Sequence, residues 1–198
     1  MHHSTSRPTH RHRFLLAWAI ANFIGGAIVN GLENYGLQFM ATLLLAGAIL
    51  GSLQGAVIRS SQLRWWPVAS AIGWIVGAYF MAFSQGLYRP LVDLLHTHLG
   101  LREGFWLNVI AAPIPVLGMA LAQSLLLGRQ GRPVWGWLVA SLAGAILQGG
   151  TSAALCPWLC PISRPFVIVV GGLGWGAYGL LTGVAGMRLF ARGNTIVL

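Results

Sequence analysis

Polar side chains recur inside the apolar segments of the sequence and are the first candidates for chemistry. They form two sets, Asn22, Ser70 and Ser141 in one, and Gln54, Gln123 and Thr182 in the other. Polar groups in hydrocarbon need partners. Hydrogen bonds between helices, worth about 0.6–2 kcal/mol each, are favoured for them. The alternative is a polar ring that holds a ligand or supplies oxygen to a pigment metal, and Gln54, Gln123 and Asn22 are its candidate contacts to a pigment or lipid.

Titratable side chains are missing from the interior of the apolar segments. No Asp, Glu, Lys or His lies within them away from their ends. Proton relays and ion pathways in membranes use such residues, and general acid–base catalysis needs one near the reaction. An intramembrane serine protease needs a nucleophile and a basic partner. The Gly150-Thr151-Ser152 sequence could supply the nucleophile, but no neighbouring segment contains a candidate His. The sequence therefore predicts no catalytic residues and no enzyme.

Histidine and cysteine provide little support for a metal centre. Four histidines lie in the first twelve residues, as expected for a solvated tail. His96 and His98, two apart on a helix, point to different faces, so no metal site is predicted. Cys156 and Cys160 are spaced one residue wider than a redox C-x-x-C pair. A loop-stapling disulfide and two free thiols remain alternatives for them.

The composition requires an apolar solvent for most of the chain. Hydrophobic residues make up 56% and charged residues 8% of the 198 residues, whereas soluble domains carry about 25% charged residues. A membrane-spanning helix needs roughly 20 apolar residues. We expect an all-α integral membrane bundle of six transmembrane helices, at 14–32, 37–58, 64–86, 105–127, 133–154 and 165–190. This single domain, 14–192, lies between a basic, His-rich tail (1–13) and a C-terminal tail (193–198).

Prolines predict details of these helices. Pro67, Pro133 and Pro165 suit the first turns of three helices, and Pro113 and Pro115 should kink the fourth.

A short helix at about 90–99 is predicted to lie on the membrane surface. Pro90 suits its start and Gly100 its end, and one face can hold Leu91, Leu94, Leu95 and His98.

Arginine placement predicts the orientation of the chain. All 12 basic residues are arginines, and alternating spans place nine of them on one side. The opposite side receives three arginines and all the acids, Glu33, Asp93 and Glu103. The positive-inside rule then puts both termini in the cytoplasm, in a bacterial inner membrane, cytoplasmic or photosynthetic. Because the arginines lie between apolar runs and form no stripe, membrane lipids and no nucleic acid are the expected partners.

A repeat begins the three outgoing helices and predicts three tandem helix hairpins. Its copies are Trp18-x-x-Ala21-Asn22-x-x-Gly25, Trp66-x-x-Ala69-Ser70-x-x-Gly73 and Trp137-x-x-Ala140-Ser141-x-x-Gly144. By analogy with other repeat-built membrane proteins, we expect pseudo-threefold symmetry about the membrane normal.

Tryptophans are expected at both membrane interfaces, where their amphipathic rings settle. The predicted belt comprises Trp18, Trp65, Trp66, Trp135 and Trp137 on the cytoplasmic side, with Trp106 and Trp158 opposite. Trp74 and Trp175 are expected deep in the core.

Two resemblances bear on function. The pattern Gly51, Gln54, Arg59, Trp65, Trp66, Ala69, Ser70 and Gly73 resembles uncharacterised small Gly/Trp-rich bacterial membrane proteins with repeated helix hairpins, and implies no activity. Six helices in about 200 residues, with Ala17 and Ala21 four apart, also resemble the substrate-binding components of energy-coupling vitamin transporters, whose first helix meets its partner through an Ala-x-x-x-Ala face.

Two functions remain open at this point. The favoured one is a non-catalytic accessory or scaffold subunit, packed among other membrane subunits of a photosynthetic or respiratory complex. Missing charges, short loops and small-residue faces motivate it. The alternative is a small-molecule transporter or substrate-capture subunit. It requires an outward-opening pocket near Glu33, Asn34, Asn108 and Gln148.

Overall fold

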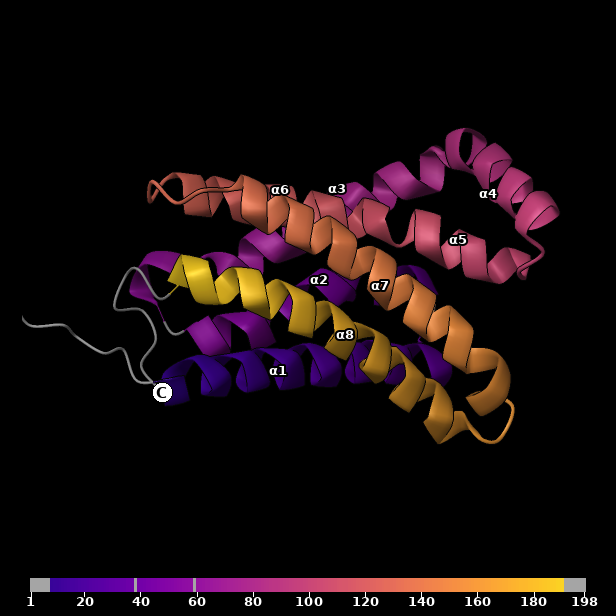
Figure 1. The fold of residues 1–198 in the computed structure, drawn as a ribbon, viewed down its shortest axis with the longest axis horizontal. Coiled ribbons are helices and arrows are strands. Elements are labelled where there is room, and N and C mark those ends of the chain that lie inside the picture. Colours follow the sequence, from indigo (N-terminus) through magenta and orange to yellow (C-terminus); the bar gives the residue numbers. More distant parts are fainter. Residues whose placement is uncertain (1–7, 38, 59, 191–198) are drawn as a thin grey trace, which may run out of the picture.

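The computed structural model describes residues 8–37, 39–58 and 60–190, and within them it contains helices and no strand. Figure 1 shows the helices packed side by side along a common long direction. They are α1 (Pro8–Asn34), α2 (Phe39–Ile58), the 3₁₀ turn η1 (Ser61–Leu63), α3 (Trp66–Phe83), α4 (Gln85–Leu99), α5 (Glu103–Ala111), α6 (Pro113–Gly128), α7 (Trp135–Leu159) and α8 (Arg164–Phe190).

Six helical segments of the described chain are long and apolar enough to cross a membrane, with α5 and α6 together forming the fourth. The outward face of α1 illustrates why lipid suits them. Leu16, Ile20, Ile24 and Ile28 follow one another at every fourth position and are 41–62% exposed, whereas Trp18 and Asn22 point inward and are fully buried. The predicted all-α fold with six helices long and apolar enough to span a membrane is confirmed, and it is compatible with a multi-pass membrane protein.

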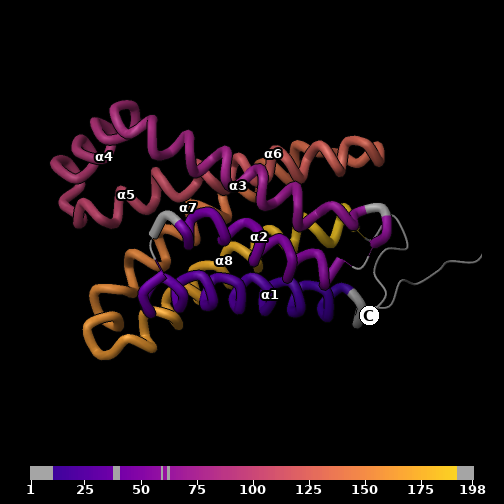
Figure 2. The backbone as a smooth tube through the Cα atoms, turned by 180° about the vertical axis from the view of Figure 1, so that it is seen from behind, coloured from indigo at the N-terminus to yellow at the C-terminus, as the bar shows by residue number. Residues whose placement is uncertain are grey.

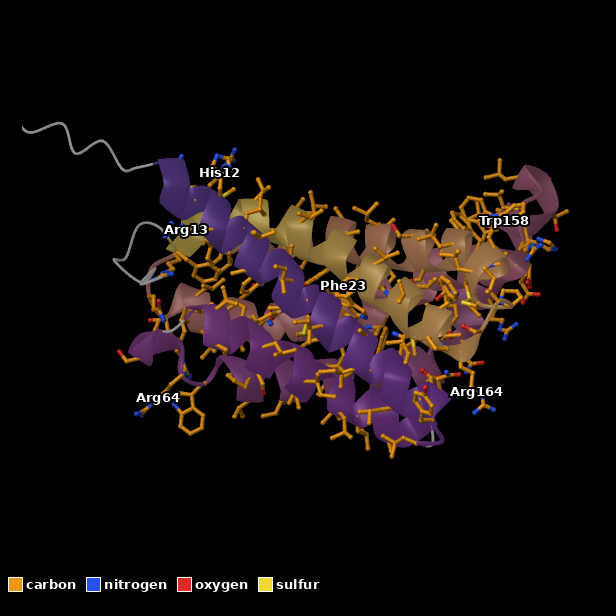
Figure 3. All side chains as sticks on the ribbon, turned by 90° about the horizontal axis from the view of Figure 1, so that it is seen from below. His12, Arg13, Phe23, Arg64, Trp158 and Arg164 are labelled. Carbon is orange, nitrogen blue, oxygen red and sulfur yellow. A yellow bond between two sulfur atoms is a disulfide. The ribbon has the colours of Figure 1, made fainter. Side chains whose placement is uncertain are left out.

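The spanning helices close into a ring. Each packs against the next one along the chain, and α8 returns to pack against α1. The start of α1 and the end of α8 lie at one end of the bundle, hereafter the termini end, and α4 lies at the other, hereafter the α4 end (Figures 1 and 2). Figure 3 places Arg13 and Arg64 at the termini end, and Arg164 and Trp158 at the opposite one.

The kink predicted in the fourth helix is present. Helix α5 ends at Ala111 and α6 begins at Pro113, so the break falls where proline removes a backbone donor and its ring crowds the preceding turn. Pro113 and Pro115 are both buried there.

Several helix ends differ from the predicted ranges. Residues 8–13, assigned to the tail, already belong to α1. Helix α7 begins at Trp135, so Pro133 precedes the helix. Helix α4 begins at Gln85, and Pro90 lies inside it. The helix loses one backbone hydrogen bond at Pro90, because the proline nitrogen carries no hydrogen to donate. On α4 Val92 is fully buried, while Leu91 and Leu94 stay exposed.

The repeated glycines allow each outgoing helix to approach the helix that follows it. A Cβ at Gly25 would lie 2.7 Å from Leu50 Cδ2 of α2, and one at Gly144 would lie 2.8 Å from Tyr178 Cδ2 of α8. A Cβ at Gly73 would collide with the Gly118 carbonyl oxygen of α6. Small residues therefore set the helix spacing, as is common in membrane bundles.

Candidate functional site

The three tryptophans of the repeat meet at the centre of the ring, near the termini end. Trp18, Trp66 and Trp137 are each 0% exposed, and their ring centroids lie 5.4–6.5 Å apart at interplanar angles of 68–75°. Such edge-to-face geometry is the favoured one for aromatic pairs. Phe190 lies 5.9–6.2 Å from all three rings. These four residues form the tryptophan cluster.

The prediction of a cytoplasmic aromatic belt is wrong for these three tryptophans. Trp65 and Trp135 are 55% and 76% exposed, as a belt requires, but Trp18, Trp66 and Trp137 are core residues. Tryptophan suits a buried place when its indole N–H finds an acceptor. Repetition at the same place in three helices was the signal that separated the core tryptophans from their neighbours.

The polar residues of the sequence lie directly beside this cluster and bind one another. Gln54 Nε2 donates to Asn22 Oδ1 at 2.8 Å, and Gln123 Nε2 donates to Ser70 Oγ at 2.8 Å and to Gln54 Oε1 at 3.2 Å. All four side chains are fully buried. We call them the amide cluster.

Each repeated tryptophan donates its indole N–H to a polar residue of the preceding helix. Trp66 Nε1 bonds Gln54 Oε1 at 3.0 Å, and Trp137 Nε1 bonds Gln123 Oε1 at 3.1 Å. Trp18 of α1 donates to Thr182 Oγ1 of α8 at 3.0 Å, which closes the cycle. An outgoing helix thus uses its tryptophan toward the preceding helix and its glycine toward the following one.

The three residues predicted to contact a cofactor, Gln54, Gln123 and Asn22, are therefore brought together, and their polar groups bind protein partners. This geometry favours hydrogen bonds between helices, while contact with a pigment or lipid stays a prediction. The Ser141 and Tyr178 hydroxyls face each other, but neither makes a hydrogen bond of good geometry.

A cavity of about 480 Å³ lies at the α4 end, between the spanning helices. We call it the α4-end cavity. Its floor is aromatic: Trp74 and Trp175 both line it, their ring centroids are 5.7 Å apart, and both are almost fully buried. Trp74 Nε1 donates to the Leu43 carbonyl at 2.6 Å, so the indole N–H of Trp74 is satisfied within the protein. The depth expected for these two tryptophans is confirmed.

The rim of the cavity is polar. Glu33, Asn108 and Gln148 line it, as the alternative function requires, together with Gln85 and Arg89 of α4. Asn34 does not line the cavity. Its Nδ2 instead donates to the Arg164 carbonyl at 3.3 Å.

Arg89 is already paired on this rim. Its Nη1 lies 3.2 Å from Glu103 Oε1, and both side chains are about half exposed. Sequence reasoning missed Gln85 and Arg89, because their place depends on how α4 packs against α5.

The two cysteines form a disulfide, Cys156–Cys160, at the last turn of α7. The disulfide lies at the α4 end, and neither cysteine lines the α4-end cavity. Among the described residues, no three His, Cys, Asp or Glu side chains come close enough together to hold a metal ion.

In comparisons with known proteins, no family model, no curated protein and no solved structure matches the chain.

Proposed function

We infer that this is an integral membrane protein that captures a small molecule in the α4-end cavity, without catalysing a reaction on it. The observation that carries the inference is the contrast along the ring axis. A cavity is present at the α4 end, while fully buried residues in mutual contact fill the axis at the termini end. That arrangement supports a cup rather than a channel.

The cavity has the character of a ligand site. Small-molecule pockets measure roughly 300–1,000 Å³ and combine apolar walls with a few polar groups. Here Trp74, Trp175 and Leu43 supply apolar surface, and Glu33 and Gln148 supply polar groups. A small molecule with one apolar part and one polar part would match these two kinds of lining residue.

The arginine bias supports an orientation for the cup. Alternating spans assign nine arginines to the side of the termini and all three acids to the opposite side. The positive-inside rule then places both termini in the cytoplasm of a bacterium and opens the cavity to the outer side of its inner membrane.

The resemblance to energy-coupling transporters receives no support from the first helix. Ala21 is only 7% exposed and Ala17 is half-buried, so this pair does not offer an open face to a partner. Capture therefore rests on the cavity alone.

A thermal-stability screen of a small-molecule library tests capture. A ligand of the cavity should raise the unfolding temperature of the detergent-purified protein by mass action. Leu107→Trp, which fills the cavity wall, should abolish the rise. Leu101→Trp, at the same end but off the cavity, should preserve it. If no molecule stabilises the protein, or if stabilisation survives Leu107→Trp, the proposal fails.

A second candidate is the accessory or scaffold subunit, favoured by a groove of about 510 Å³ on the lipid-facing surface. It lies between α3 and α6, and its lining is apolar, with Val76, Phe80 and Leu117 among the residues. An apolar groove on the lipid-facing surface suits packing by a helix of another membrane subunit.

Gentle purification from native membranes, with mass spectrometry and an absorption spectrum, tests this second candidate. Stoichiometric large subunits should appear with wild-type protein and be lost with Leu117→Trp, which fills the groove. They should survive Leu125→Trp, which changes an exposed residue of α6 outside the groove. A solitary, colourless protein would contradict it.

A further inference from the structure

The acids of the chain gather at the α4 end, and they differ in their surroundings. Glu103 is paired with Arg89 at 3.2 Å. Asp93 is exposed on α4 and does not line the cavity. Glu33 does line the cavity, and within the described residues its carboxylate joins no salt bridge. The rim of the cavity therefore carries one exposed carboxylate that joins no salt bridge among the described residues.

Glu33 lies above the aromatic floor. Val29 and Glu33, one turn apart on α1, both line the cavity, and Val29 packs against the core that contains Trp74 and Trp175. One helical turn rises about 5.4 Å. A ligand that reaches from Glu33 to the floor would therefore place its charged group beside the carboxylate and its apolar body against the two tryptophans.

The neighbouring amide presents an acceptor to the same space. Asn108 Nδ2 donates to the Gly104 carbonyl at 2.8 Å, which leaves the Asn108 oxygen as the group free to accept from a ligand. A carboxylate and an amide oxygen together accept hydrogen bonds from an ammonium group. An anionic ligand would be repelled by Glu33, and Arg89 is already engaged by Glu103.

We propose that the α4-end cavity binds an organic amine in its ammonium form, with an aromatic or apolar body. Glu33 is the counter-ion, Asn108 accepts an N–H, and Trp74 and Trp175 hold the apolar body. The inference rests on the proposed function, since it names the ligand class of the same cavity.

Three probes that share an indole and differ in one group test the charge requirement: tryptamine (ammonium), tryptophol (hydroxyl) and indole-3-acetate (carboxylate). Calorimetric titration of the purified full-length protein should find tryptamine tightest, by about tenfold over tryptophol, the gain expected of a charge-assisted hydrogen bond. Indole-3-acetate should bind weakest.

Glu33→Gln should remove the tryptamine advantage and leave tryptophol binding unchanged. Asp93→Asn removes the same charge at the same end but off the cavity, and should leave both affinities as in wild type. Equal binding of the three probes, absence of tryptamine binding, or an equal loss in both variants would overturn the amine proposal. Capture itself would still stand if tryptophol or a library ligand binds and Leu107→Trp prevents it, so the two proposals fail separately.

Discussion

The two ends of the helical ring are built by the same six helices but differ in how completely they are filled. At the termini end the tryptophan cluster and the amide cluster occupy the axis, and every member is fully buried. Toward the α4 end, Trp74 and Trp175 fill only the floor, and a cavity of about 480 Å³ follows. Trp66 and Trp74 lie eight residues apart on α3, about 12 Å along the helix, so the change is abrupt.

The difference is explained by which residues recur. The tryptophan and its polar partner occur in all three pairs of helices, so three large rings converge on one level and satisfy their N–H groups there. At the level of Trp74 and Trp175, the remaining pair of helices, α1 and α2, contributes no tryptophan to the cavity. Two large rings in place of three leave space at the α4 end. Stability should reside at the termini end and binding at the α4 end.

The largest effect on stability is expected from Trp66→Ala. Removal of a fully buried tryptophan costs about 3–5 kcal/mol in protein cores, and it also leaves the Gln54 oxygen without the indole donor. The melting temperature in detergent should fall strongly. Trp65→Ala, at the adjacent exposed residue, should change it little. Equal effects of the two substitutions would contradict the assignment of the stable core to the tryptophan cluster.

Gly73→Ala should have the next largest effect. The added methyl would collide with the Gly118 carbonyl oxygen, and overpacking a tight contact costs about 1–3 kcal/mol. Gly136→Ala is the matched control, because a Cβ there meets no atom within 4 Å. If thermal unfolding shows both variants to be as stable as wild type, the glycine contacts do not set the helix spacing.

Gln123→Leu should destabilise the protein by about 1–2 kcal/mol. The substitution removes the acceptor of Trp137 and the donor to Ser70, both of them buried. A double-mutant cycle with Trp137→Phe measures the coupling: the two losses should be less than additive, because one bond is counted in both. Additive losses would mean that this hydrogen bond contributes nothing.

Arg89→Ala at the open end should change stability least, by less than about 1 kcal/mol. Its ion pair with Glu103 is about half exposed, and exposed pairs are worth about 0–1 kcal/mol. The small loss should shrink further at high salt, which unfolding measured at two ionic strengths would detect. A loss as large as that of Gln123→Leu would remove the contrast between the ends.

Much of the fold was predictable because apolar length is a direct requirement of the bilayer. The six spans and the kink before Pro113 follow from segment length and from proline chemistry. The inward place of Trp18, Trp66 and Trp137 was missed, because burial of a tryptophan depends on partners such as Gln54 that only the folded chain brings near.

The candidate site was predictable in part. Polarity at span ends pointed to Glu33, Asn108 and Gln148, since such residues face water or a cavity. The contributions of Gln85 and Arg89 depend on the direction in which α4 leaves α3 after Ser84 and packs against α5. The sequence pattern predicts a helix in this segment but not its direction.

Side-specific cysteine labelling tests the central contrast between an open and a closed end most directly. Asn108→Cys lies on the cavity wall, and Ser70→Cys lies in the amide cluster. Wild type is the control, since its own two cysteines are joined in a disulfide. With a membrane-impermeant maleimide and sealed vesicles of both orientations, we expect Asn108→Cys to react from the outer face alone and Ser70→Cys to react from neither. Labelling of Ser70→Cys, or of Asn108→Cys from the cytoplasmic face, would contradict a cup that opens outward and is closed below.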